Sequence, residues 1–185
     1  MKRFNKTAGT LALLLTLVLT TSARSSSPKP TSRDYLTPKE IELVKDAQVL
    51  DERIDVFIKA AERRFLVLSG QTTSAPTSKK EQKEADKWGE LPKGTRAELI
   101  TDIAGILDAA IENIDDVALR DEKNPLIPKS LKKLAAAATR FQAQLTSMQG
   151  QAKEAAERTA IEQALENVQE ILEAAAKLQS QPAKK

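Results

Sequence analysis

Apolar residues recur at steps of three or four along the first part of the chain, which is the spacing of one face of an α-helix. Thr37 can cap this helix, Pro38 suits its first position, and Glu40 completes a capping box three residues after the cap. We expect a single helix that continues to Ser69 and Gly70. Its apolar face consists of Ile41, Val44, Ala47, Leu50, Ile54, Phe57, Ala61, Phe65 and Leu68.

A second start signal lies at Thr95, with Glu98 three residues later, and the pattern predicts a helix that ends near Arg120. Gly105 inside this helix costs about 1 kcal/mol relative to Ala. We therefore expect a neighbouring helix to approach closely at Gly105. The apolar face consists of Leu99, Ile103, Ile106, Ala110, Ile114 and Val117.

Residues 124–179 carry two further apolar seams that are one residue out of phase with each other. Pro125 and Pro128 fit the first turn of a helix, because backbone donors there lack intrahelical partners. The change of phase favours a hairpin that turns near Gly150, and one long helix is the alternative, since one Gly need not end a helix. The seams are Leu131, Leu134, Ala138, Phe141, Leu145 and Met148, and then Ile161, Leu165, Val168, Leu172 and Ala175.

Residues 71–93 form a low-complexity insertion between the first two helical patterns, and within it Lys79 to Lys87 predict a short exposed helix. The fold class expected for the chain is all-α, with three or four long amphipathic helices forming a bundle over residues 37–180. Residues 181–185 are expected to be a disordered tail.

The first 23 residues have the three parts of an export signal: a basic start at residues 2–6, an apolar run at residues 8–19, and small residues up to Ala23. The apolar run has 12 residues, whereas a helix needs about 20 to cross a bilayer. Cleavage near Ala23 is therefore favoured over retention as an anchor. We expect a periplasmic or extracellular protein that begins with a flexible leader at residues 24–36.

Composition excludes several classes of function. The 185 residues include 29 basic and 26 acidic ones, and the three basic residues of the export signal account for the whole excess. A formally neutral mature chain is not expected to bind nucleic acid by bulk charge. There is no Cys and no His, so thiol nucleophiles, imidazole bases and the usual ligands of zinc, copper and haem are absent. No cofactor and no enzymatic activity are expected.

Two stripes of carboxylates suggest a metal site or an acid and base pair at first sight. Helical spacing opposite an apolar face is, however, typical of a solvated surface. No catalytic, cofactor-binding or metal-binding residue is therefore assigned. The stripes are Asp108, Glu112 and Asp115, and Glu162, Glu166, Glu170 and Glu173.

Three apolar residues are candidates for binding a partner. Trp88 lies in a polar stretch, where it either plugs the end of the bundle or presents an exposed anchor. Leu126 and Ile127 either staple the start of their helix or take part in recognition, and the staple is the commoner arrangement.

The charge distribution predicts which segments pack together. Residues 94–123 have eight acidic and three basic side chains, whereas residues 124–150 have four basic and none acidic. We expect these two segments to pack antiparallel, with the basic patch neutralised inside the molecule. The patch consists of Lys129, Lys132, Lys133 and Arg140.

Three short motifs resemble a group of exported bacterial helical proteins to which no activity is assigned. They are Leu36-Thr37-Pro38-Lys39-Glu40-Ile41, Trp88-Gly89-Glu90-Leu91-Pro92 and Lys123-Asn124-Pro125-Leu126-Ile127-Pro128. The resemblance covers residues 36–148. It implies an all-α exported protein and carries no ligand and no catalytic residue.

The leading functional hypothesis is a non-enzymatic interaction or structural module of the cell envelope, which binds a protein partner or itself. The alternative is a carrier that holds a small apolar or amphipathic ligand between Ala-rich helices. Contact of a membrane surface with the amphipathic helix from Lys153 to Leu178 is a third hypothesis. Its glutamates disfavour it, because anionic lipid would repel them.

Overall fold

The structure, a computed structural model, describes residues 34–71 and 78–180, and all regular structure in them is α-helical. This confirms the all-α class. The predicted export signal, residues 24–33 of the leader, residues 72–77 of the insertion and the tail at 181–185 lie outside the described residues. The helices are α1 (Pro38–Asp46), α2 (Leu50–Leu68), α3 (Lys79–Trp88), α4 (Arg96–Arg120), α5 (Leu126–Gln149) and α6 (Ala155–Ser180).

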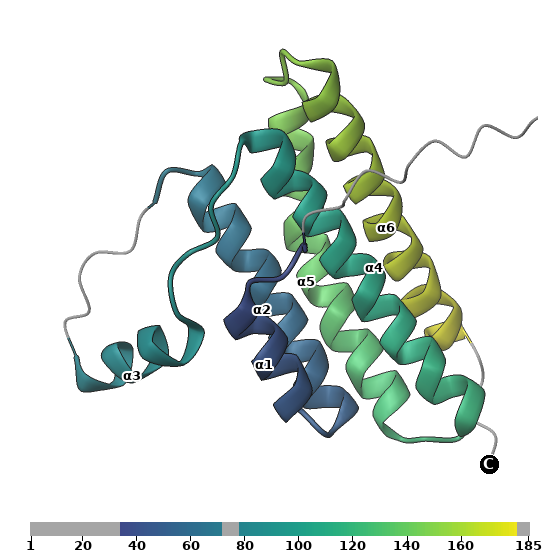
Figure 1. The fold of residues 1–185 in the computed structure, drawn as a ribbon. Coiled ribbons are helices and arrows are strands. Elements are labelled where there is room, and N and C mark those ends of the chain that lie inside the picture. The colour runs from purple at the N-terminus through teal and green to yellow at the C-terminus, as the bar shows by residue number, and fades with distance from the viewer. Residues whose placement is uncertain (1–33, 72–77, 181–185) are drawn as a thin grey trace, which may run out of the picture. The chain divides into compact units, whose positions relative to one another are not determined.

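The four longest helices, α2, α4, α5 and α6, lie side by side and alternate in direction along the chain (Figure 1). Helix α6 packs against α4 and α5, and α2 packs against the same two helices. Helix α1 covers α2, and α3 packs against α1 and reaches α2 through Trp88, which lies beside Arg63. None of the described helices is both long and apolar enough to span a membrane. All four long helices supply core side chains, among them Ile54, Phe57, Ile103, Ile106, Leu134, Leu145, Ile161 and Val168.

Both predicted capping boxes are confirmed. At the start of α1, the Thr37 hydroxyl accepts a hydrogen bond from the Glu40 amide, and the Thr37 amide donates to the Glu40 carboxylate. Thr95 and Glu98 make the same reciprocal pair at the start of α4, which ends at Arg120 as expected. The short helix expected from Lys79 is α3, and all of its described side chains before Trp88 are exposed.

The single helix predicted from Thr37 to Ser69 is wrong, because the chain breaks at residues 47–49 into α1 and α2. Ala47 and Val49 have extended backbone, and the Nε of Arg53 donates to the carbonyl of Ala47 across the break. An unbroken helix would separate Glu40 from Arg63 by about 35 Å. Because α1 folds back on α2, these two side chains meet at 3.1 Å.

The hairpin in the second half of the chain is confirmed. Helix α5 ends at Gln149, Gly150 follows as its C-cap, and α6 begins at Ala155 and packs back along α5. The two prolines occupy the expected start of α5, with Pro125 as the N-cap and Pro128 in the first turn. The phase shift in the sequence therefore marks a turn.

Three residues of the basic patch form ion pairs within the molecule, but their partners lie on α2 rather than on the acidic segment before α5. Lys129 and Lys133 contact Asp51 at 2.9 and 3.0 Å. Farther along, Lys133 contacts Asp55 and Arg140 contacts Glu62, and each of these pairs is 78 positions apart. Helices α4 and α5 do run antiparallel and contact each other, as expected, although each packs more extensively against α2 and α6.

Gly105 does allow a close approach, but the neighbour is a side chain and not a helix. A Cβ atom at this position would lie 3.1 Å from the ring of Tyr35. Tyr35 precedes α1, and Leu36 beside it is buried. The last residues of the expected flexible leader therefore pack against α4.

Substitution of Asp51 by Asn is expected to lower the free energy of unfolding near pH 7. Hydrogen bonds from Lys129 and Lys133 lower the pKa of Asp51, so its carboxylate stabilises the fold at pH values above its unfolded pKa. That contribution is lost as the pH falls through the lowered value, so the variant and the wild type should converge below about pH 4. Urea unfolding across this pH range measures the difference, with Glu52→Gln as the control one residue away.

Candidate functional site

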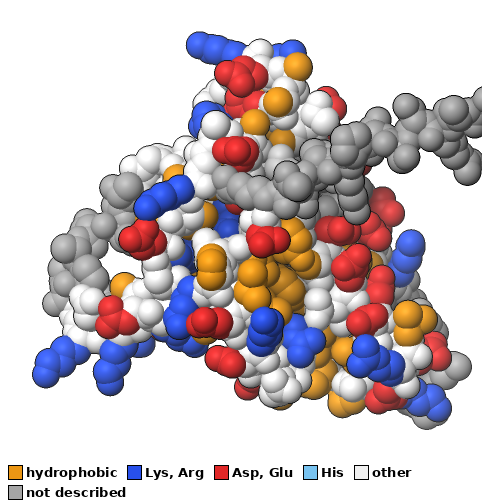
Figure 2. Space-filling view, in the orientation of Figure 1, with side chains coloured by type: hydrophobic (Ala, Val, Ile, Leu, Met, Phe, Trp, Pro, Cys, Tyr) orange, Lys and Arg blue, Asp and Glu red, His pale blue; other side chains and the backbone are white. Residues whose placement is uncertain are grey.

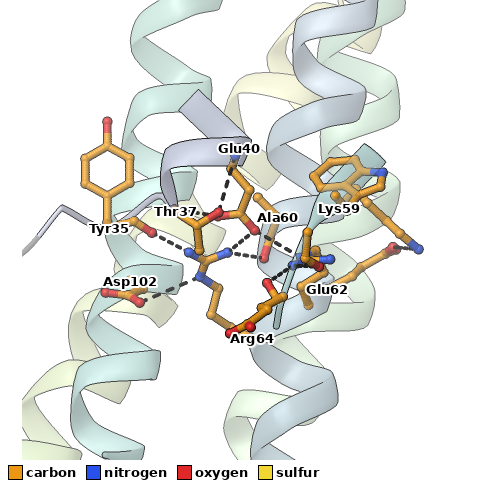
Figure 3. A network of polar contacts seen from close by, with 12 residues as sticks. Tyr35, Thr37, Glu40, Lys59, Ala60, Glu62, Arg64 and Asp102 are labelled. Carbon is orange, nitrogen blue, oxygen red and sulfur yellow. Dashed lines mark hydrogen bonds and ion pairs between the residues drawn. The ribbon is translucent and has the colours of Figure 1, made fainter. Parts of the chain in front are cut away.

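The carboxylate of Glu40 is the centre of a buried polar network that joins α1 to α2 (Figure 3). Glu40 is 0% exposed. Its Oε1 accepts from the Nε of Arg63 at 3.1 Å and from the Nη1 of Arg64 at 2.6 Å, while its Oε2 accepts from the Thr37 amide. The glutamate that caps α1 is therefore also the counter-ion of two arginines.

Arg64 connects this carboxylate to two further segments. Its Nη2 donates to the carbonyl of Tyr35 at 2.7 Å, and its Nη1 donates to the carbonyl of Ala60. Its Nε lies 3.7 Å from an Asp102 carboxylate oxygen of α4 and makes no hydrogen bond to the described residues. The guanidinium is 1% exposed, so two carboxylates balance the buried positive charges.

Arg63 connects the network to the segment after α3. Its Nη2 donates to the carbonyls of Gly89 and Glu90, and its guanidinium lies 5.5 Å from the centroid of the Trp88 ring. Burial lowers the pKa of Arg63 from its ordinary value, and the charge of Glu40 opposes that shift. Trp88 in turn donates from its indole nitrogen to Glu84.

The network holds the fold together and leaves little for a substrate to contact. Each buried arginine already donates to the Glu40 carboxylate and to backbone carbonyls. The guanidinium donors therefore hold α1, the segment before it and the segment after α3 against α2. Sequence reasoning identified Glu40 only as a cap and missed both arginines. The available signal was an Arg pair inside an apolar stretch, between Ala61 and Phe65.

The three candidate partner-binding residues lie at less accessible positions than an anchor requires. Trp88 is 5% exposed and packs beside Arg63, so it neither projects from the surface nor plugs the end of the four long helices. Leu126 and Ile127 are partly buried and pack against the core at the start of α5. They are the first two residues of α5, so neither precedes the helix as a staple residue does.

Both acidic stripes lie on exposed helix faces. Figure 2 shows acidic side chains gathered over α4. Burial raises the pKa of the neighbouring Tyr35, and the negative charges of Glu112 and Asp108 raise it further. The α6 glutamates surround an open hollow of about 500 Å³. Among the described residues, no group of acidic side chains has the geometry to hold a metal ion.

A groove with a volume of about 830 Å³ lies between the C-terminal ends of α2 and α5. The rings of Phe65 and Phe141 stack at 5.0 Å between centroids and line this α2–α5 groove. The other lining residues are Glu62, Leu66, Leu68, Ser69, Gln71, Arg96, Arg140, Ala143, Gln144, Ser147, Met148 and Gln151.

The groove exists because of the register between α2 and α5. The 78-residue offset of the ion pairs sets Leu66 level with Gln144 and Ser69 level with Ser147. Ser69 and Ser147 are short side chains that leave the space between the helices open there. The sequence gives no signal for this site, because the residues that border it are brought together only by that register.

Comparison with protein-family models, curated proteins and solved structures finds no match for this chain.

Replacing Glu40 by Gln is expected to lower the free energy of unfolding by about 3–5 kcal/mol, because two buried guanidiniums lose their counter-ion. Chemical denaturation at neutral pH measures the loss. Glu42→Gln is the matched control, since Glu42 lies on the same helix and pairs with Lys39 at the exposed surface. Equal effects of the two substitutions would show that the network does not hold α1 in place.

Proposed function

We propose that this protein is an exported, non-enzymatic interaction module of the cell envelope. In this proposal a helical bundle, freed from its signal peptide near Ala23, binds a protein partner in the α2–α5 groove. The observation that carries the proposal is the groove itself, which combines an apolar floor with a polar rim on an otherwise charged surface. The proposal of export depends on the basic start, the short apolar run and the small residues of positions 1–23.

Two observations support the proposal that the protein is not an enzyme: its composition, and the hydrogen-bond partners that its buried charged groups already have. The chain has no Cys and no His. The buried arginines near α1 donate to carboxylates and to backbone carbonyls, and the described acidic stripes lie on solvated helix faces. A structural or binding role needs none of the nucleophiles and bases that are missing.

A carrier of a small apolar or amphipathic ligand is the second candidate, and one observation favours it. The volume of about 830 Å³ lies within the range of small-molecule sites. The groove lies between α2 and α5, however, and not between the two Ala-rich helices α5 and α6. It is also open along its length, whereas small-molecule sites bury most of the ligand surface.

Binding of a membrane surface by α6 is disfavoured by the packing of this helix. The apolar face that would enter the lipid includes Ile161, Ala164 and Val168, and all three side chains are buried in the core. Its exposed face carries Glu162, Glu166, Glu170 and Glu173, which anionic lipid would repel.

Native mass spectrometry of the protein recovered from its own cell envelope tests the proposal. We expect a chain that begins near Arg24, in a complex with another protein or with itself. Ser147→Trp fills the groove and is expected to abolish the complex. Thr146→Trp is the matched control, because Thr146 is the exposed neighbour that does not line the groove.

Three results would contradict the proposal. A bare monomer from all three proteins would argue against any interaction role. A small added mass that Ser147→Trp removes would favour the carrier. Turnover of a substrate by the purified wild type, on a panel for hydrolysis and group transfer, would exclude a non-enzymatic role.

A further inference from the structure

We infer that the occupant of the α2–α5 groove is an acidic amphipathic helix of a partner protein. This inference rests on the proposed interaction function and names the chemistry of the partner. Three properties of the groove support it: its helical spacing, the small side chains at its centre, and the arginines at its rim.

The groove can accommodate a third helix between α2 and α5. Helices α2 and α5 run parallel here, and their lining residues recur at helical steps, with Glu62, Phe65 and Ser69 facing Phe141 and Met148. From Arg140 to the end of α5 at Gln149 the groove follows about 13 Å of helix at 1.5 Å per residue, which is about two and a half turns. Two parallel helices with an open furrow between them can receive the ridge of another helix.

The side chains at the centre of the groove allow a helix to approach closely. Ser69, Ala143 and Ser147 are short, so a partner backbone is not held away from the floor. On either side of them lie apolar surfaces, which include Leu66, Met148 and the stacked phenylalanine pair. A partner with apolar residues at positions i, i+3 or i+4, and i+7 would bury them against this floor.

The charges at the rim select an acidic partner. Arg96 and Arg140 have side chains that are 46% and 55% exposed, and each guanidinium has donors beyond those it uses inside the molecule. Arg96 donates to Glu157, which is nearly buried, and Arg140 donates to Glu62. The charged residues that line the groove are Arg96, Arg140 and Glu62, so the lining carries one net positive charge. Carboxylates along a partner helix would pair with these arginines.

Other occupants fit the groove less well. An aliphatic chain needs an enclosing cavity, and this groove is open along two helices. An extended peptide gains its affinity from a free sheet edge, and the described residues contain no strand. A basic helix would meet Arg96 and Arg140 with like charge.

The test uses synthetic helical peptides of about three to four turns with leucines at i, i+3, i+7 and i+10. Three versions carry Glu, Gln or Lys at the flanking positions. Fluorescence anisotropy with the folded full-length mature protein measures their dissociation constants. We expect the Glu version to bind at least about tenfold more tightly than the Lys version, and this preference should shrink in high salt.

Matched variants test whether the peptides bind in the groove. Ser147→Trp is expected to abolish binding of the Glu peptide, and Thr146→Trp is expected to leave it unchanged. The double substitution Arg96→Gln and Arg140→Gln should remove the preference for Glu over Lys. Lys132→Gln removes one positive charge from α5 at a position that does not line the groove, and this variant should keep the preference for Glu over Lys. Circular dichroism and thermal unfolding confirm that each variant is folded.

The inference is overturned if no peptide binds at millimolar concentration, or if the Lys version binds as tightly as the Glu version. It is also overturned if dodecanoate binds in place of the peptides and Ser147→Trp abolishes that binding, which would identify a small acidic amphiphile as the occupant. If the peptides fail while the native complex still depends on Ser147, the inference is wrong and the proposed function stands. If the native complex does not depend on Ser147, the proposed function fails.

Discussion

Glu40 is a carboxylate with no exposed surface, and such a group is stable in a protein interior only when charged donors surround it. Arg63 and Arg64 supply these donors from the middle of α2. Helix α1 must fold back to reach them, so the chain turns at residues 47–49. The same guanidiniums donate to carbonyls before α1 and after α3, so one charge cluster connects three segments to α2.

The remaining charged residues of α2 have a different consequence. Its outer carboxylates pair with α5 at a constant offset of 78 residues, from Asp55 with Lys133 to Glu62 with Arg140. This offset brings short side chains opposite each other beyond the phenylalanine stack and leaves the α2–α5 groove unfilled. The groove is therefore a result of the register at which α2 and α5 pack, which the ion pairs accompany. It is also where apolar surface and half-exposed arginines lie together, which is the basis of the binding role proposed for this protein.

Local chemistry was readable in the sequence wherever a few neighbouring residues decide the backbone. The capping boxes at Thr37 and Thr95 and the turn at Gly150 belong to this class. The break before α2 was not readable, because the apolar spacing continues through Ala47 and Leu50 as if the helix were unbroken. Trp88 was judged by its polar neighbours in sequence, whereas its burial depends on Arg63, which is 25 positions away.

The sequence by itself determined the all-α class, most helix boundaries and the acidic faces that point to solvent, because helix propensity, caps and apolar periodicity act over one or two turns. Tertiary structure alone decided which charges pair. Complementary totals in residues 94–123 and 124–150 pointed to α4 and α5, but the lysines of α5 meet the aspartates of α2. Net charge does not specify a partner. Pairing depends on which helices become neighbours around the core, and that order also placed the buried network and the α2–α5 groove.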